Sequence, residues 1–191
     1  MTALLTLLVL AQSDSMLPLL ERGQVVLVEA GKDGKFGSAT GFVLVDAPPE
    51  TVWQTLNKME EFKDFVPKVL VSEVLRSKGT ESEVHFVIDV PGPDTDYTIR
   101  YTRDDTNKTL SGLWSKGDLQ GTRLFWKVES AQGGKTLLSQ KVSVKNFSAI
   151  LANVEDEQQT MTVGVNVSSA LAAAKAIKRK SEQAAAAASA K

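Results

Sequence analysis

Two reactive residue types are scarce in this sequence: cysteine is absent, and His85 is the single histidine. Without cysteine the chain has no disulfide framework, no thiolate nucleophile and no cysteine-based metal site. A single histidine excludes any metal site that needs two, and a serine–histidine relay would have to use His85 itself. No nucleophile–base pair is evident elsewhere, so the sequence predicts no catalytic residues, no bound metal and no cofactor.

An excess of one charge and long apolar runs are lacking as well. Lysine and arginine total 22 against 23 aspartate and glutamate, which leaves a net charge of −1. A balanced chain lacks the positive field that general nucleic-acid binding needs, so we expect no nucleic-acid partner. The apolar run in residues 1–11 is too short to span a bilayer as a helix. We therefore expect no integral membrane segment and at most transient membrane contact.

Residues 1–11 have the pattern of a short signal peptide, with Val9 and Ala11 as the small residues before Gln12. This pattern favours export to the periplasm or beyond. No lysine or arginine precedes the apolar run, so a packed N-terminal helix in a cytoplasmic protein is the alternative. Residues 12–38 are interpreted as an N-terminal extension.

The remainder of the chain alternates between strand and helix patterns. Residues 83–90 and 96–103 alternate apolar and polar side chains, which is typical of half-buried strands. Other strands are predicted at 24–29, 39–46, 68–76, 109–115, 119–130 and 136–146, separated by short turns as in an antiparallel meander. Two short helices are expected within residues 50–65.

A longer helix is predicted after residue 155 by an apolar stripe through Val163, Val167, Leu171, Ala174 and Ile177. Small residues at 170–176 would let this helix lie close to a sheet. The acidic residues 155–157 suit a helix N-terminus better than a cation site, because adjacent helical residues do not share a face. The alanine-rich tail, residues 183–191, is expected to fray or to be disordered.

Three stretches resemble the START-like SRPBCC superfamily, which includes polyketide cyclases, the birch-pollen allergen fold and coenzyme-Q-binding proteins. They are residues 43–56 (VLVDAPPETVWQTL), residues 62–69 (FKDFVPKV), and residues 71–75 followed by Gly79. Within the superfamily the chain looks most like the bacterial polyketide-cyclase and coenzyme-Q-binding branch. The resemblance covers residues 39–182. It implies an α+β helix-grip fold, in which a bent antiparallel β-sheet wraps around a long C-terminal α-helix.

The resemblance also implies an apolar cavity between the sheet and the terminal helix. The geometry agrees, since one helix about 10 Å wide cannot fill the concave face of a strongly bent sheet. Each candidate lining residue could equally be ordinary core. The candidates are Phe86, Ile88, Tyr97, Ile99, Tyr101, Trp114, Trp126, Val163, Val167 and Leu171.

The leading functional hypothesis is a monomer that binds a lipid or another hydrophobic small molecule without catalysis. One alternative is a polyketide cyclase or aromatase-like enzyme, which needs ionisable groups in the cavity. His85, Asp89 and Arg100 are out of phase with the apolar residues of their strands, so they enter the cavity only if the register is inverted. The other alternative is a protein-interaction domain without a ligand.

Overall fold

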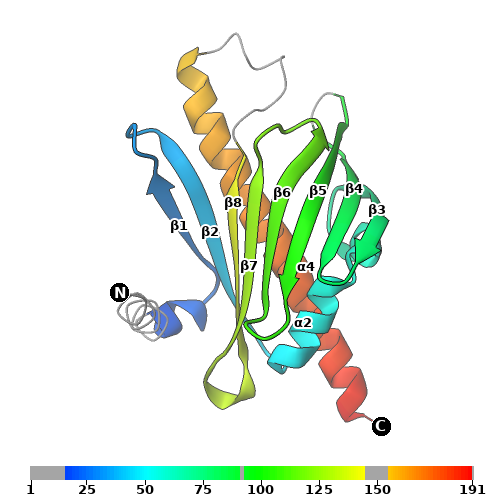
Figure 1. Ribbon diagram of the computed structural model, residues 1–191. Coiled ribbons are helices and arrows are strands. Elements are labelled where there is room, and N and C mark those ends of the chain that lie inside the picture. Colours follow the sequence, from blue (N-terminus) through cyan, green and yellow to red (C-terminus); the bar gives the residue numbers. More distant parts are fainter. Residues whose placement is uncertain (1–15, 91–92, 145–154, 191) are drawn as a thin grey trace.

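The computed structural model describes residues 16–90, 93–144 and 155–190, and the side chains of residues 155–161 lie outside the described part. The predicted signal peptide therefore lies outside it as well, as do the acidic side chains at 155–157. The described strands form one sheet of eight members (Figure 1). They are β1 (Val25–Ala30), β2 (Phe36–Val45), β3 (Val69–Lys78), β4 (Glu81–Ile88), β5 (Thr95–Asp104), β6 (Thr109–Gly117), β7 (Arg123–Ser130) and β8 (Thr136–Ser143).

The sheet is entirely antiparallel, in the order β1-β2-β8-β7-β6-β5-β4-β3. Strands β3 to β8 form a meander, which the short turns between them favour. Strand β2 pairs with β8, so a strand from the first part of the chain lies beside the last strand. Strand β1 lies within the segment interpreted as an extension, and it adds an edge strand beside β2.

Helix α4 (Glu155–Ser189) crosses the concave side of the sheet from the end of β8 towards α2 (Figure 1). Helix α2 (Pro49–Asn57), a 3₁₀ turn (Met59–Glu61) and α3 (Phe62–Phe65) connect β2 to β3. Together these elements form the α+β helix-grip fold that the sequence predicted. The helix continues through the alanine-rich tail to Ser189, where fraying was expected. Alanine's high helix propensity accounts for this difference.

The strands predicted from alternation are confirmed. Val84 and Phe86 of β4 are buried, and Ile99 and Tyr101 of β5 are buried on the same face. Two strand starts are wrong: β2 begins at Phe36 and not at residue 39, and β7 begins at Arg123 and not at residue 119. Leu119 adopts a positive φ of 59°, and its carbonyl accepts hydrogen bonds from the backbone and the hydroxyl of Thr122. Local side-chain bonding therefore makes residues 119–122 a turn.

The buried face of α4 is rotated from the predicted stripe. Its buried residues are Asn166, Ala170, Ala174, Ile177 and their neighbours Ala176 and Ser181. Val163, Val167 and Leu171 are half-buried on the flank of that face. Asn166 is accommodated because its amide pairs with both backbone groups of Val144, at 2.7 and 3.1 Å. This pairing fixes the helix against the end of β8.

Candidate ligand-binding interior

Helix α4 approaches the sheet unevenly. It packs most extensively against β2 and β8 and only slightly against β1, and it makes no extensive contact with β4, β5 or β6 in the described part of the chain. The helix comes very near the sheet at Gly41 of β2, where an added Cβ would lie 3.0 Å from the carbonyl oxygen of Ala170. Small residues on both surfaces permit this approach, as predicted for residues 170–176. The helix backbone therefore lies nearer to β2 than to β4–β6, and on that farther side Ile177 of α4 shares one buried apolar cluster with Phe86 and Tyr101.

Aromatic side chains line the inner face of β4 and β5 in this cluster. Phe86 stacks on Tyr97 with ring centroids 5.6 Å apart, and it meets Tyr101 edge-on at 6.5 Å. Phe62 lies 6.4 Å from Phe86 on the α3 side. The Tyr101 ring leans over Gly112 of β6, where an added Cβ would lie 2.7 Å from Cε1 of the ring. The absence of a side chain at Gly112 therefore decides where this ring lies.

Tyr97 and Tyr101 are the only tyrosines of the protein, and both belong to this wall. Burial raises the pKa of Tyr97, and burial followed by the neighbouring Tyr97 raises the pKa of Tyr101. Both phenols are thus neutral near pH 7 and can act as hydrogen-bond donors. Buried polar groups normally have a hydrogen-bond partner.

Gln140 of β8 is a further interior polar group, which the sequence interpretation missed. It is 5% exposed, and its Oε1 atom is buried without a partner among the described residues. It shares the concave face with Gly41 and Trp126 of the neighbouring strands. Its phase in the strand, two residues from Leu138 and from Val142, was the available signal. Ser181 of α4 also has a buried hydroxyl without a partner in the described part of the chain.

The predicted lining residues divide into three groups. Phe86, Ile99, Tyr101 and Trp126 are buried in the main apolar cluster, and Tyr97 and Trp114 pack against it. The Trp114 indole also donates to two carbonyls of the β6–β7 turn, at 2.9 and 3.2 Å. The remaining residues are half-buried: Ile88, Val163, Val167 and Leu171. The lining role of all these residues stays a prediction.

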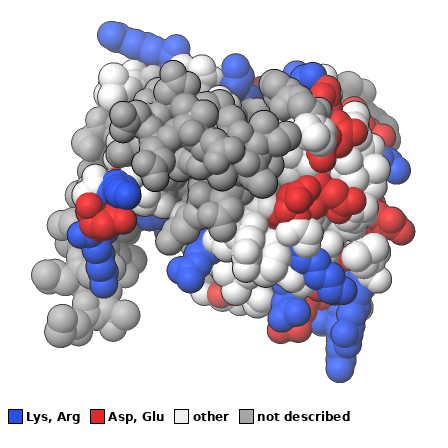
Figure 2. Space-filling model, turned by 90° about the horizontal axis from the view of Figure 1, so that it is seen from above, with Lys and Arg blue, Asp and Glu red and all other residues white. Residues whose placement is uncertain are grey.

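The charged residues whose register was in doubt lie away from the interior. His85 Nε2 lies 2.9 Å from Asp96 Oδ1 on the outer face. Arg100 is exposed, and Asp89 forms an ion pair with Lys68. Near this end of β4 and β5, acidic side chains gather on one side of the molecule, while lysines and arginines are spread around the periphery (Figure 2). The described side chains in this view form no continuous basic surface.

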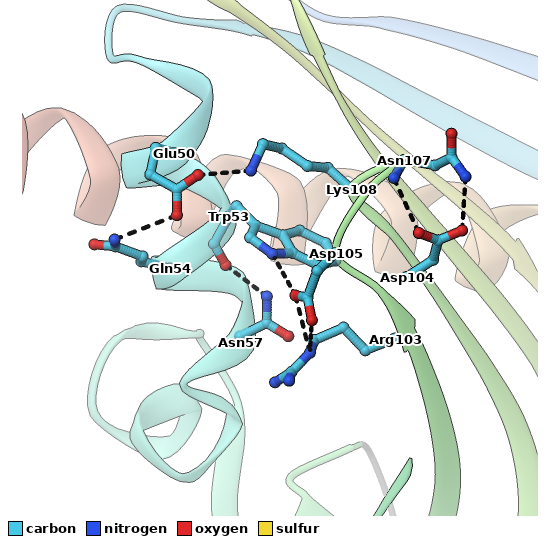
Figure 3. Close-up of polar contacts among 9 residues, drawn as sticks. All are labelled: Glu50, Trp53, Gln54, Asn57, Arg103, Asp104, Asp105, Asn107 and Lys108. Carbon is cyan, nitrogen blue, oxygen red and sulfur yellow. Dashed lines mark hydrogen bonds and ion pairs between the residues drawn. The ribbon is translucent and has the colours of Figure 1, made fainter. Parts of the chain in front are cut away.

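A polar clamp joins α2 to the turn between β5 and β6 (Figure 3). The buried Trp53 donates its indole N–H to Asp105 Oδ1 at 3.0 Å, and Asp105 also pairs with Arg103. Lys108 reaches Glu50 at 2.6 Å and lies 5.9 Å above the Trp53 ring. The carboxylate of Glu50 has a lowered pKa, first because of its hydrogen bond from Lys108. The clamp therefore fixes α2 across one end of the interior.

Open hollows occur on the surface of the described part of the chain. One of about 900 Å³ lies between the α2–α3 connection and the β3–β4 hairpin. At its base are Met59 and Leu110, which belong to the main apolar cluster. The others, of about 1170 and 390 Å³, border the β1–β2 hairpin and the β7–β8 turn respectively. None of the predicted lining residues borders these three hollows.

The chain belongs to the family described as "Polyketide cyclase / dehydrase and lipid transport", whose profile matches residues 45–168. This match confirms the START-like resemblance. A search of curated proteins found no match. In the described part of the chain, no helix is long and apolar enough to cross a membrane, and no group of three potential metal ligands occurs.

Several solved structures share the fold at low sequence identity. A Thermus thermophilus protein has 19% identity and a TM-score of 0.66, covering 77% of this chain and 98% of its own. The Zhui aromatase/cyclase of a Streptomyces species has 17% identity and a TM-score of 0.63, covering 76% and 93%. A STAR-related lipid transfer protein of Xanthomonas axonopodis has 17% identity and a TM-score of 0.64, covering 84% and 94%. These neighbours include both a cyclase and a lipid transfer protein.

Proposed function

We propose that this protein binds a lipid or another hydrophobic small molecule between the aromatic half of its sheet and α4, without catalysis. The uneven approach of the helix is the observation that carries the proposal. Gly41 and Ala170 bring the two layers together on one side, and towards β4, β5 and β6 the backbone of α4 lies farther from the sheet. A ligand inserted on that side would contact the aromatic wall formed by Phe86, Tyr97 and Tyr101.

Apolar burial would supply most of the affinity. Each buried methylene contributes about 0.8 kcal/mol, while association costs about 4 kcal/mol or more. A micromolar dissociation constant corresponds to about 8 kcal/mol net. The ligand therefore needs roughly fifteen methylene equivalents of buried surface if apolar contact acts alone. A long acyl, prenyl or polyketide chain meets this requirement.

The hollow beside the α2–α3 connection is the access route that we favour. It leads from the surface to Met59 and Leu110 of the main apolar cluster. The clamp between Trp53 and Asp105 holds α2 beside this route. Movement of the α2–α3 connection would then widen the hollow without disturbing the sheet.

The chemistry of the interior supports binding over acid–base catalysis. The buried polar side chains of the described residues include no aspartate, glutamate, histidine, lysine or arginine. The two titratable tyrosines have raised pKa values and keep their protons near neutral pH. A cyclase or aromatase needs groups that exchange protons near the operating pH.

The test uses the full chain purified from its expression host. We expect its organic extract to contain a stoichiometric apolar compound, or the extracted and refolded protein to bind the neutral dye Nile red saturably. Leu124→Trp should abolish this binding, because Leu124 packs against both apolar clusters inside the sheet. The matched control is Phe125→Trp, which places the same side chain at the next, exposed position of β7.

Absence of both a bound compound and saturable dye binding would refute the proposal. Equal loss of binding in the two tryptophan variants would place the dye outside the interior and would count against it as well. Circular dichroism of each variant checks that the fold is retained.

A further inference from the structure

The two outermost strands of the sheet differ in how their free edges are built. Strand β1 forms one edge and β3 the other, and no described segment pairs with the outer side of either strand (Figure 1). Such an edge presents backbone N–H and C=O groups that can pair with another chain. Natural sheets usually block it with bulges, charged side chains or prolines, so an edge without these features indicates a partner.

Strand β3 carries two of these protective features. Its register with β4 shifts within residues 69–71 and again within residues 74–76. Such irregularities bend a strand and disrupt the even spacing of its backbone groups. Charged side chains also recur along it, at Glu73, Arg76 and Lys78. The β3 edge is therefore a poor template for another strand.

Strand β1 lacks both features over residues 25–28. Its register with β2 is unbroken across this stretch, which consists only of valine and leucine. Leu27 is 42% exposed and Val28 is 51% exposed, although a partner strand would cover them. This edge is therefore regular, apolar and uncharged, which is the form that pairs readily with a further strand.

The charged residue at the end of this stretch, Glu29, is already engaged on its own chain. Lys141 of β8 forms an ion pair with its carboxylate, and the hydroxyl of Ser38 donates a hydrogen bond to it at 2.7 Å. The carboxylate therefore faces β2 and β8 and does not need a cation from a partner strand.

We propose that two copies of this protein associate by antiparallel pairing of their β1 strands, so that one sheet continues through the dimer. With the two-fold axis at Leu27, each Val26 lies opposite Val28 of the other copy, and each Val25 lies opposite Glu29. Apolar side chains then meet across most of the pairing, and the two Glu29 side chains are kept apart at its ends. The proposal departs from the monomer predicted from the sequence, and it is independent of the proposed function.

The contrast between the edges limits the assembly to two copies. Pairing of β1 with β1 is isologous, and it leaves the two β3 strands as the outer edges of the joined sheet. Growth stops there, because β3 is irregular and charged. Pairing of β1 with β3 would instead be heterologous and could continue into a fibre. Because the interface is one strand wide, we expect a weak dimer with a micromolar dissociation constant.

Sedimentation velocity of the full chain from about 1 to 300 μM tests the association. We expect the mass to rise from one copy to two and no further. Leu27→Lys should raise the dissociation constant at least about tenfold, because two like charges then meet at the two-fold axis. Leu75→Lys is the matched control, since it makes the same change at a position of the β3 edge that is 50% exposed. It should leave the association unchanged.

Mixing of charge variants tests whether the strand pairs with itself. Leu27→Glu should weaken association as Leu27→Lys does, since like charges again meet. An equimolar mixture of the two variants should form the dimer again, because opposite charges then lie across the axis.

A cross-link reports the pairing without placing a charge in the strand. The chain has no cysteine, so Leu27→Cys carries a single thiol. Directly opposed residues of antiparallel strands have Cα atoms about 4.5–5.5 Å apart, which a disulfide can span. Mild oxidation should therefore link Leu27→Cys into a covalent dimer and leave Leu75→Cys unlinked. This measurement gives an answer even if the charged variants do not fold, which circular dichroism checks.

Three results would overturn the proposal. One is a single-copy mass over the whole concentration range together with no cross-linking of Leu27→Cys. Another is an association that Leu27→Lys and Leu75→Lys weaken equally, or that the mixed charge variants fail to restore. The third is a mass that keeps growing beyond two copies.

Discussion

Replacing Gly112 by alanine tests the position of the Tyr101 ring directly. The new Cβ would lie 2.7 Å from Cε1 of the ring and 3.0 Å from Cγ2 of Ile99, whereas ordinary contacts begin near 3.4 Å. The ring cannot stay over Gly112 at that separation. It must move away from β6, into the space assigned to the ligand.

The expected loss of stability follows from two opposing terms. Overpacking a buried site costs about 1–3 kcal/mol. Alanine recovers about 0.5–1 kcal/mol, because glycine loses more backbone entropy when it is ordered in a strand. The net destabilisation lies between about 0 and 2.5 kcal/mol, or at most roughly 10 °C in melting temperature for a chain of this length.

Urea unfolding followed by tryptophan fluorescence measures this change. The matched control is Gly164→Ala in α4, where an added Cβ meets nothing within 4 Å. This control should be neutral or stabilising, because alanine favours helix. Since Tyr101 and Tyr97 are the only tyrosines, isotope-labelled tyrosine spectra should show a shift in Gly112→Ala and none in Gly164→Ala. Unchanged stability together with unchanged tyrosine signals would refute the placement of the ring.

Two further predictions concern the clamp and the phenols. Asp105→Ala should lower the free energy of unfolding by about 1–3 kcal/mol, because it leaves the indole N–H of the buried Trp53 without its acceptor. The control is Asp33→Ala in an exposed turn. Equal urea midpoints for the two variants would contradict the prediction. Burial raises both tyrosine pKa values above the ordinary 10.0. The tyrosines therefore do not lower the free energy of unfolding below pH 10, and this free energy falls as the pH rises from there through the pKa values of the folded state. Tyrosinate absorbance should therefore appear together with alkaline unfolding, and its appearance near pH 10 in a folded protein would disprove the burial.

Alternation along the strands was sufficient to predict the inward face of the sheet. Val84, Phe86 and Ile99 are buried because a strand places every second side chain on one face. The same pattern placed His85 on the outer face, where the structure has it beside Asp96. These predictions depended only on local periodicity.

Features that depend on distant pairing could not be predicted in this way. Asn166 lies in the buried stripe of α4 because the backbone of Val144 satisfies its amide, and a hydrophobic pattern gives no sign of this. Gln140 was missed although it is in phase with Leu138 and Val142, because a polar residue at a core position interrupts the apolar pattern. The close packing of Gly41 on Ala170 requires the register of a helix on a strand far away in sequence.

The pairing of β2 with β8 has a consequence for how the chain folds. Phe42 faces Ser139, so the middle of the sheet closes only after almost a hundred further residues are available. Until then β1 gives β2 a partner along one edge through a local hairpin. During synthesis this hairpin would shield one side of an apolar strand from other chains, while the opposite edge stays open for the last strand to arrive.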